Sequence, residues 1–140
     1  MDLGPHLLLA LLEGCVAAFV LAVTALGLSL VFGVMRIVNV AHGEFFMLGA
    51  VIAWWITSLV PDAPFWGFML ALVGAPLAVG AIAVAADALV LRRLNYQPEA
   101  TIVATIGLLY ILQQLVLSIY GPDARPVVAP IQFRIVFPWF

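Results

Sequence analysis

Residues 33–50, GVMRIVNVAHGEFFMLGA, place a short polar segment between two long apolar runs. The segment contains Arg36, Asn39, His42 and Glu44, whereas the runs that flank it carry no charged residue. Polar groups in or beside a lipid bilayer are costly, so their presence there indicates a functional role by default. This segment is therefore the first candidate for a functional site.

The composition of the chain around this segment is that of a membrane protein. Of its 140 residues, 66% are hydrophobic and only 9% are charged, and the mean hydropathy is +1.25. Soluble domains carry roughly 25% charged residues. We therefore expect the chain to lie in a lipid bilayer.

Long uncharged runs predict how often the chain crosses the bilayer. A helix needs about 20 apolar residues to span it, and the uncharged runs cover residues 14–35, 45–61, 63–86 and 100–122. We predict an all-α, polytopic membrane protein that forms a single transmembrane domain over 1–140. Its about four transmembrane helices are expected at 7–35, 39–61, 63–91 and 100–120, with an external loop at 121–140.

The second predicted helix is the short one. Its uncharged run spans the bilayer comfortably only if the helix begins near Asn39, and asparagine is a favourable N-cap residue.

Arginine placement predicts the orientation. Arg36 lies between the first two predicted helices, and Arg92 and Arg93 lie between the last two. The positive-inside rule makes these connections cytoplasmic and both termini external. We also expect Asp87 to lie at a helix end, paired with a nearby arginine.

Several function classes are excluded by what the sequence lacks. All five basic residues are arginines, so a Walker A lysine is missing, as is a lysine for Schiff-base chemistry. A net charge of −2 without a basic run argues against a nucleic-acid partner. A single cysteine, Cys15, makes neither an intrachain disulfide nor a metal framework. With no nucleophile–base pair at suggestive spacing, we expect no enzyme, no metal site and no catalytic residues.

The polar segment allows two interpretations. In the first, it is a broken or re-entrant helix entry that lines a substrate path or gate, because transporters often place helix N-termini at their sites. In the second, it is a tight cytoplasmic turn, and the spacing alone favours this turn. The candidate path or gating residues in the segment are Arg36, Asn39, His42, Gly43 and Glu44.

Two further features concern the helices. Gln113 and Gln114 lie deep in the fourth helix, where they either line a polar cavity or join helices by hydrogen bonds, the role we favour. Small residues at four-residue spacing let helices approach closely and indicate a packed bundle or a subunit interface. The candidates for this packing role are Ala25, Ser29, Gly33, Gly49 and Ala53.

Two sequence blocks carry a family resemblance. GLSLVFGVMRIVNVAHGEFFMLGA at 27–50 and ATIGLLYILQQ at 104–114 resemble the permease subunits of branched-chain amino acid ABC importers. In the first block the matching positions include Arg36, Asn39 and His42. The resemblance covers the N-terminal half of the family's pattern, so we expect a truncated chain or one half of a longer permease.

The resemblance implies a function and a set of partners. It implies a multi-pass protein of the cell's inner (plasma) membrane that moves branched-chain amino acids by alternating access. The implied partners are a second permease subunit, a periplasmic amino-acid-binding protein and cytoplasmic ABC ATPase subunits. Those ATPases would bind the ATP, so no cofactor is expected on this chain.

Other functions stay open at this level. Permeases for urea or short amides share much of the signature. A structural bundle that oligomerises without transporting anything is the alternative from another class, although it has no need for the polar segment. A small channel would need more polar residues than these helices carry.

Overall fold

The computed structural model describes residues 3–123, 125–127 and 129–130, and within them the chain is helical without strands. Its α-helices are α1 (Leu3–Met35), α2 (His42–Ser58), α3 (Pro64–Ala86) and α4 (Pro98–Tyr120). A π-helical turn, η1 (Asp87–Leu91), and a 3-10 turn, η2 (Arg92–Leu94), continue α3. The predicted all-α fold of a polytopic membrane protein is confirmed.

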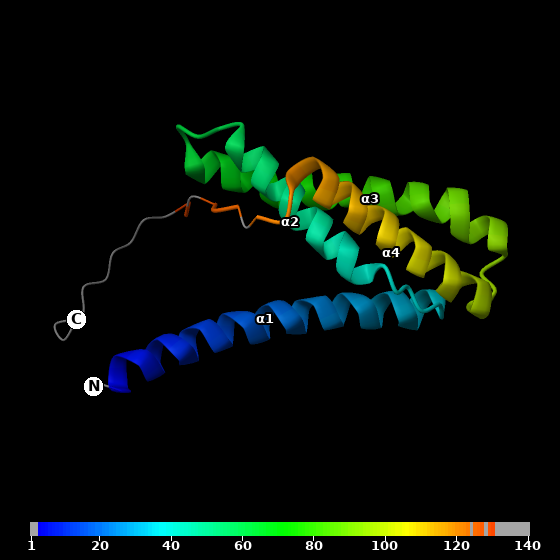
Figure 1. The fold of residues 1–140 in the computed structure, drawn as a ribbon, viewed down its shortest axis with the longest axis horizontal. Coiled ribbons are helices and arrows are strands. Elements are labelled where there is room, and N and C mark those ends of the chain that lie inside the picture. Colours follow the sequence, from blue (N-terminus) through cyan, green and yellow to red (C-terminus); the bar gives the residue numbers. More distant parts are fainter. Residues whose placement is uncertain (1–2, 124, 128, 131–140) are drawn as a thin grey trace.

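The helices alternate in direction. In Figure 1, α1 and α3 run one way and α2 and α4 return, so the α1–α2 and α3–α4 connections meet at one end of the molecule. Arg36 lies in the first connection, and Arg92 and Arg93 lie in the second. The arginines used to predict the orientation therefore share one end, as that prediction requires.

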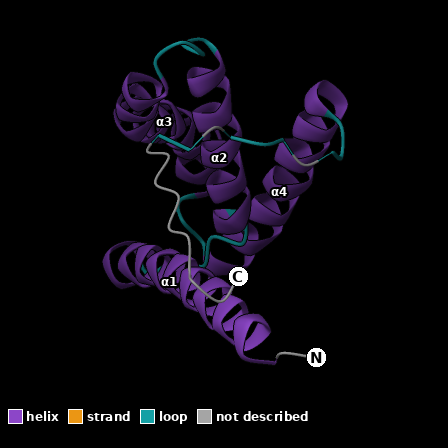
Figure 2. Cartoon of the chain, turned by 90° about the vertical axis from the view of Figure 1, so that its left-hand side faces the viewer, coloured by secondary structure: helices purple, strands orange, loops and turns teal. Residues whose placement is uncertain are grey.

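Helix α2 is the centre of the packing. Figure 2 shows it between α3 and α4, with α1 crossing apart from the other three. Few apolar side chains are buried, and three of them pack together as a cluster: Leu48 on α2 with Leu112 and Val116 on α4. Most large apolar side chains of α1 are exposed, as expected of a helix that faces lipid or other subunits.

The length of α2 bears on the predicted count of about four membrane spans. Three helical segments are long and apolar enough to cross a membrane: His6–Val34, Pro64–Leu94 and Pro98–Tyr120. The fourth, α2, has 17 residues and is roughly 25 Å long at 1.5 Å per residue, short of the roughly 30 Å hydrocarbon core. The prediction of about four spans assumed that α2 starts at Asn39, whereas it starts at His42. The count of about four spans stays a prediction.

Other helix ends also differ from the predicted ones. Helix α4 begins at Pro98 rather than near 100, because proline is well suited to the first helical position. It ends before Gly121, whose φ is 76°. Regular α-helix stops at Ala86 rather than 91, although the π and 3-10 turns extend the helical run to Leu94. Helix α1 begins at Leu3, earlier than the predicted 7.

Candidate functional site

The polar segment forms a tight turn between α1 and α2. The Arg36 N–H still donates to the Phe32 carbonyl at 2.9 Å, but its φ of 54° ends α1. A left-handed residue commonly ends a helix and is usually glycine, so an arginine there is unusual. The Arg36 side chain is exposed. The chain then continues without helix until Ala41.

Asn39 organises the start of α2 from outside the helix. Its Oδ1 accepts the Ala41 N–H at 3.0 Å, and its carbonyl accepts the His42 N–H at 3.2 Å. This is an Asx-type turn, in which the side chain satisfies backbone two residues on. The N-cap position itself is Ala41, without a side-chain cap. The predicted cap at Asn39 is thus corrected to a turn that precedes the helix.

His42 joins the start of α2 to α1. Its Nε2 lies 3.3 Å from the Thr24 carbonyl oxygen, and because a carbonyl can only accept, this nitrogen carries the proton. The ring also packs on Gly27, where an added Cβ would lie 3.4 Å from Cε1 and Nε2. His42 therefore contacts α1 where a glycine leaves room for its ring.

Thr105 joins the same turn to α4. Its Oγ1 accepts the Val40 N–H at 3.3 Å, across 65 positions of sequence, and donates to the Ile102 carbonyl at 3.0 Å. The Thr105 side chain is fully buried, and so is Thr101 one turn earlier. The Thr101 hydroxyl has no hydrogen-bond partner among the described residues. The polar turn is thus held by α1 through His42 and by α4 through Thr105.

Asp87 adds a carboxylate to these polar groups, and we call Asn39, His42, Thr105 and Asp87 together the polar cluster. The Nε of Arg92 lies 3.3 Å from Oδ2 of Asp87, and the Tyr96 hydroxyl donates to the same oxygen at 3.3 Å. The expected pairing of Asp87 with a nearby arginine is confirmed. The other oxygen, Oδ1, is buried and has no partner within the described part of the chain. Asp87 opens the π turn η1, a type of helix defect that is frequent at functional sites.

Asn39, Asp87 and Thr105 line one small cavity. Its volume is about 150 Å³, and the rest of its wall is mostly apolar, from α1, α2, α3 and α4. One water occupies about 30 Å³ in the liquid, so this space has room for several waters or a small polar group. The cavity can hold waters or a small polar group where the turn meets the helices that line it. Its polar residues form no nucleophile–base pair.

The remaining predicted polar residues are more peripheral. The backbone N–H of Glu44 donates to the Ala41 carbonyl at 3.0 Å, and its acidic side chain in the first turn of α2 suits the helix dipole. Gly43 is exposed, and an added Cβ there would meet open space. Gln113 and Gln114 are exposed on α4, and Gln114 lies 3.5 Å from Ser118 of its own helix. The structure therefore brings neither glutamine into the cluster.

The predicted small-residue positions divide into two groups. On α1, Ala25, Ser29 and Gly33 are exposed, and an added Cβ at Gly33 would meet nothing within 4 Å. They make no packing interface within the described chain. On α2, Gly49 and Ala53 line an apolar groove of about 570 Å³ beside α3.

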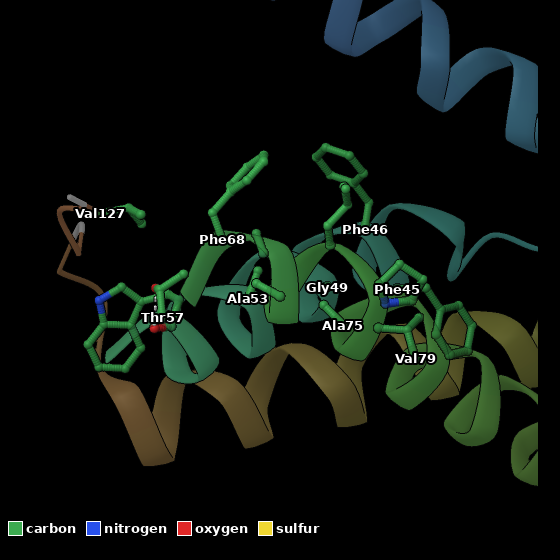
Figure 3. A pocket seen from close by; sticks show the side chains of 14 residues that line it. Phe45, Phe46, Gly49, Ala53, Thr57, Phe68, Ala75, Val79 and Val127 are labelled. Carbon is green, nitrogen blue, oxygen red and sulfur yellow. Dashed lines mark hydrogen bonds between the residues drawn. The ribbon is translucent and has the colours of Figure 1, made fainter. Parts of the chain in front are cut away.

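That groove is an open face of the α2–α3 pair. Figure 3 shows Gly49, Ala53 and Ala75 along its floor, while Phe46 and Phe68 stand at its rim and point away from α4. A Cβ added at Gly49 would lie 3.7 Å from Val79, an ordinary contact distance. Small residues of α2 and α3 thus lie along the groove where these two helices pack together; their packing role stays a prediction.

Sequence reasoning missed the two α1 residues that contact His42. Thr24 contributes a backbone carbonyl, which no side-chain pattern reveals, and Gly27 matters through the space that it leaves. Thr101 and Thr105 were not missed: the sequence places both on the early turns of the fourth predicted helix, four residues apart on one face, where they either face a polar cavity or join helices by hydrogen bonds.

Comparison with known proteins bears on the same segment. Residues 10–136 match the family model described as the permease component of branched-chain amino acid transport systems. The match includes the polar turn, α2, α3 and α4. Comparisons with curated proteins and with solved structures gave no match. Among the described residues, no group of three or more histidine, cysteine or acidic side chains is placed to hold a metal ion.

Proposed function

Because the chain belongs to the family of permease components of branched-chain amino acid transport systems, we propose that it is a transmembrane subunit of an ABC importer. The predicted permease resemblance is thereby confirmed, and the chain is a multi-pass membrane protein of a transport family, not of an enzyme class. The import mechanism, the substrate and the partners are the proposal.

The observation that carries the proposal is the family match together with the polar turn inside it. A purely structural bundle has no use for a turn that is hydrogen-bonded to two other helices and whose Asn39 lines a small cavity together with Asp87 and Thr105. His42 and Thr105 connect the turn to α1 and α4 through single hydrogen bonds of 3.3 Å each. Two hydrogen bonds of this length stabilise the observed arrangement of the helices only modestly, so a second arrangement stays accessible. Alternating access requires two such arrangements.

In the proposed mechanism, the chain makes no covalent change to its substrate. Separate cytoplasmic ATPase subunits bind ATP and thereby bias the permease between outward-open and inward-open states. A periplasmic binding protein delivers the amino acid to the permease, which lies in the inner membrane. A second permease subunit completes the transport pathway. In this proposal, the exposed faces of α1 are covered by other parts of the transporter.

Reconstituted transport tests the proposal. The permease would be purified with its ATPase subunits, placed in liposomes and supplied with binding protein and ATP, and uptake of labelled leucine, isoleucine and valine would be measured. We expect ATP-dependent uptake that unlabelled valine suppresses and that urea or acetamide does not. Suppression by the amides would assign the chain to amide permeases, and an assembled complex that moves none of these solutes would support a structural role.

A further inference from the structure

Another pocket lies toward the ends of α2 and α4 that are far from the polar turn. Its volume is about 270 Å³, and it lies between these two helices and the segment that follows α4. The helices contribute an apolar wall that includes Met47, Val51 and Val116. The following segment contributes two charged residues, Asp123 and Arg125.

The guanidinium group of Arg125 is held in a defined position. Its Cζ lies 5.1 Å from the centre of the Trp54 ring, and Nη2 donates to the Tyr120 carbonyl at 2.9 Å. Trp54 and Tyr120 meet edge to face, with ring centres 5.9 Å apart. A guanidinium has five N–H donors, so the bond to Tyr120 leaves most of them for a ligand.

The two charges in this pocket do not neutralise each other. Within the described part of the chain, the one ion pair joins Arg92 and Asp87; Arg125 and Asp123 form none. Among the described residues, the pocket therefore presents an exposed cation and an exposed anion that are not paired, beside an apolar wall. Guanidinium groups bind carboxylates well because two N–H donors match two oxygens, and a carboxylate accepts hydrogen bonds from an ammonium group.

We propose that this pocket is a subsite that binds zwitterionic α-amino acids with aliphatic side chains as they enter the permease. Arg125 receives the α-carboxylate, Asp123 receives the α-ammonium group, and Val51 and Val116 contact the side chain. The volume lies just below the roughly 300–1,000 Å³ of drug-sized sites, which suits one small ligand. This inference rests on the proposed transport function and adds which residues select the ligand.

Binding to the full chain in lipid nanodiscs tests the subsite directly. The probes are leucine, leucine methyl ester, which lacks the carboxylate, and 4-methylpentanoate, which lacks the ammonium group, with tryptophan fluorescence as the readout because Trp54 lines the pocket. We expect leucine to bind roughly tenfold or more tightly than either analogue, since each loses a charge-assisted hydrogen bond.

Two variants test which charged residue binds which group of leucine. Asp123→Asn should weaken the binding of leucine about tenfold and leave the affinity for 4-methylpentanoate unchanged. Arg125→Gln should weaken the binding of leucine and leave the affinity for the methyl ester unchanged. Asp62→Asn and Arg93→Gln remove exposed charges elsewhere and should bind leucine as the parent chain does. Because Arg125 also packs on Trp54, the Asp123 variant keeps the test valid if Arg125→Gln does not fold.

The same variants separate this inference from the proposed function. In the reconstituted importer, both should raise the KM for leucine with little change in the maximal rate. Parental affinity and KM in Asp123→Asn would overturn the subsite while leaving the transport function intact. An assembled importer that transports no amino acid, with no leucine binding to the chain, would overturn both.

Discussion

Thr101 and Thr105 offer a matched pair of substitutions on one face of α4. Both side chains are fully buried, but only Thr105 has hydrogen-bond partners: the Val40 N–H at 3.3 Å and the Ile102 carbonyl at 3.0 Å. The Thr101 hydroxyl has none among the described residues. Valine has nearly the shape of threonine, so each substitution removes one hydroxyl without opening a cavity.

The expected effects have opposite signs. Hydrogen bonds between membrane helices contribute about 0.6 kcal/mol on average and up to about 1.7, and a buried donor left unpaired costs about 1–3 kcal/mol. The Val40 bond is long, so we expect Thr105→Val to lower the free energy of unfolding by about 1 kcal/mol. Thr101→Val removes a buried hydroxyl that lacks a partner, so it should be neutral or stabilising by up to about 1 kcal/mol.

Unfolding of the purified chain in mixed micelles, titrated with dodecyl sulfate and followed by far-ultraviolet circular dichroism, measures both values. A difference of 1 kcal/mol changes the ratio of folded to unfolded protein about fivefold, which such a titration resolves. Equal losses in the two variants, or a larger loss in Thr101→Val, would refute the role assigned to Thr105.

Two further predictions concern topology and helix packing. In a Cys15→Ala background, a cysteine at position 93 should resist an impermeant thiol reagent added from outside, because the positive-inside rule places it in the cytoplasm; rapid labelling would reverse the orientation. A Cβ at Gly74 would lie 2.9 Å from Ile56 Cδ1, the far end of that side chain, whereas a Cβ at Gly80 would meet open space. Alanine favours a helix interior over glycine by about 1 kcal/mol, so Gly80→Ala should raise the free energy of unfolding by about that amount in the same titration. Gly74→Ala should raise it by less, because Ile56 must shift; equal gains in the two variants would contradict the contact.

The sequence predicted those parts of the fold that depend on composition and on local residue preference. Uncharged runs located the four helices, and the arginines located the two connections that share one end. The pairing of Asp87 followed from an arginine five positions later on the same helical run. Each of these features depends on residues near one another in the sequence.

The errors arose where distant residues decide the local structure. Helix α2 starts at His42 rather than Asn39 because Asn39 forms an Asx turn and because Thr105, far away in the sequence, accepts the Val40 N–H. That shift gives α2 a length of 17 residues. The pocket with Arg125 was also missed, because Trp54 and Arg125 meet only when the segment after α4 passes the end of α2.

We propose that the polar turn takes part in transport by joining α2 to α1 through His42. The decisive measurement is uptake of labelled leucine per assembled complex, made for three histidine variants. His42→Ala removes the bond to the Thr24 carbonyl, and His42→Gln retains an N–H donor; His6→Ala alters the other histidine, exposed on α1.

We expect His42→Ala to lower uptake about fivefold at normal abundance of the complex, which corresponds to a bias of about 1 kcal/mol between two states. His42→Gln should recover part of the loss, and His6→Ala should transport as the parent does. Parental uptake by His42→Ala at parental abundance would contradict the claim and reduce the segment to a connecting turn.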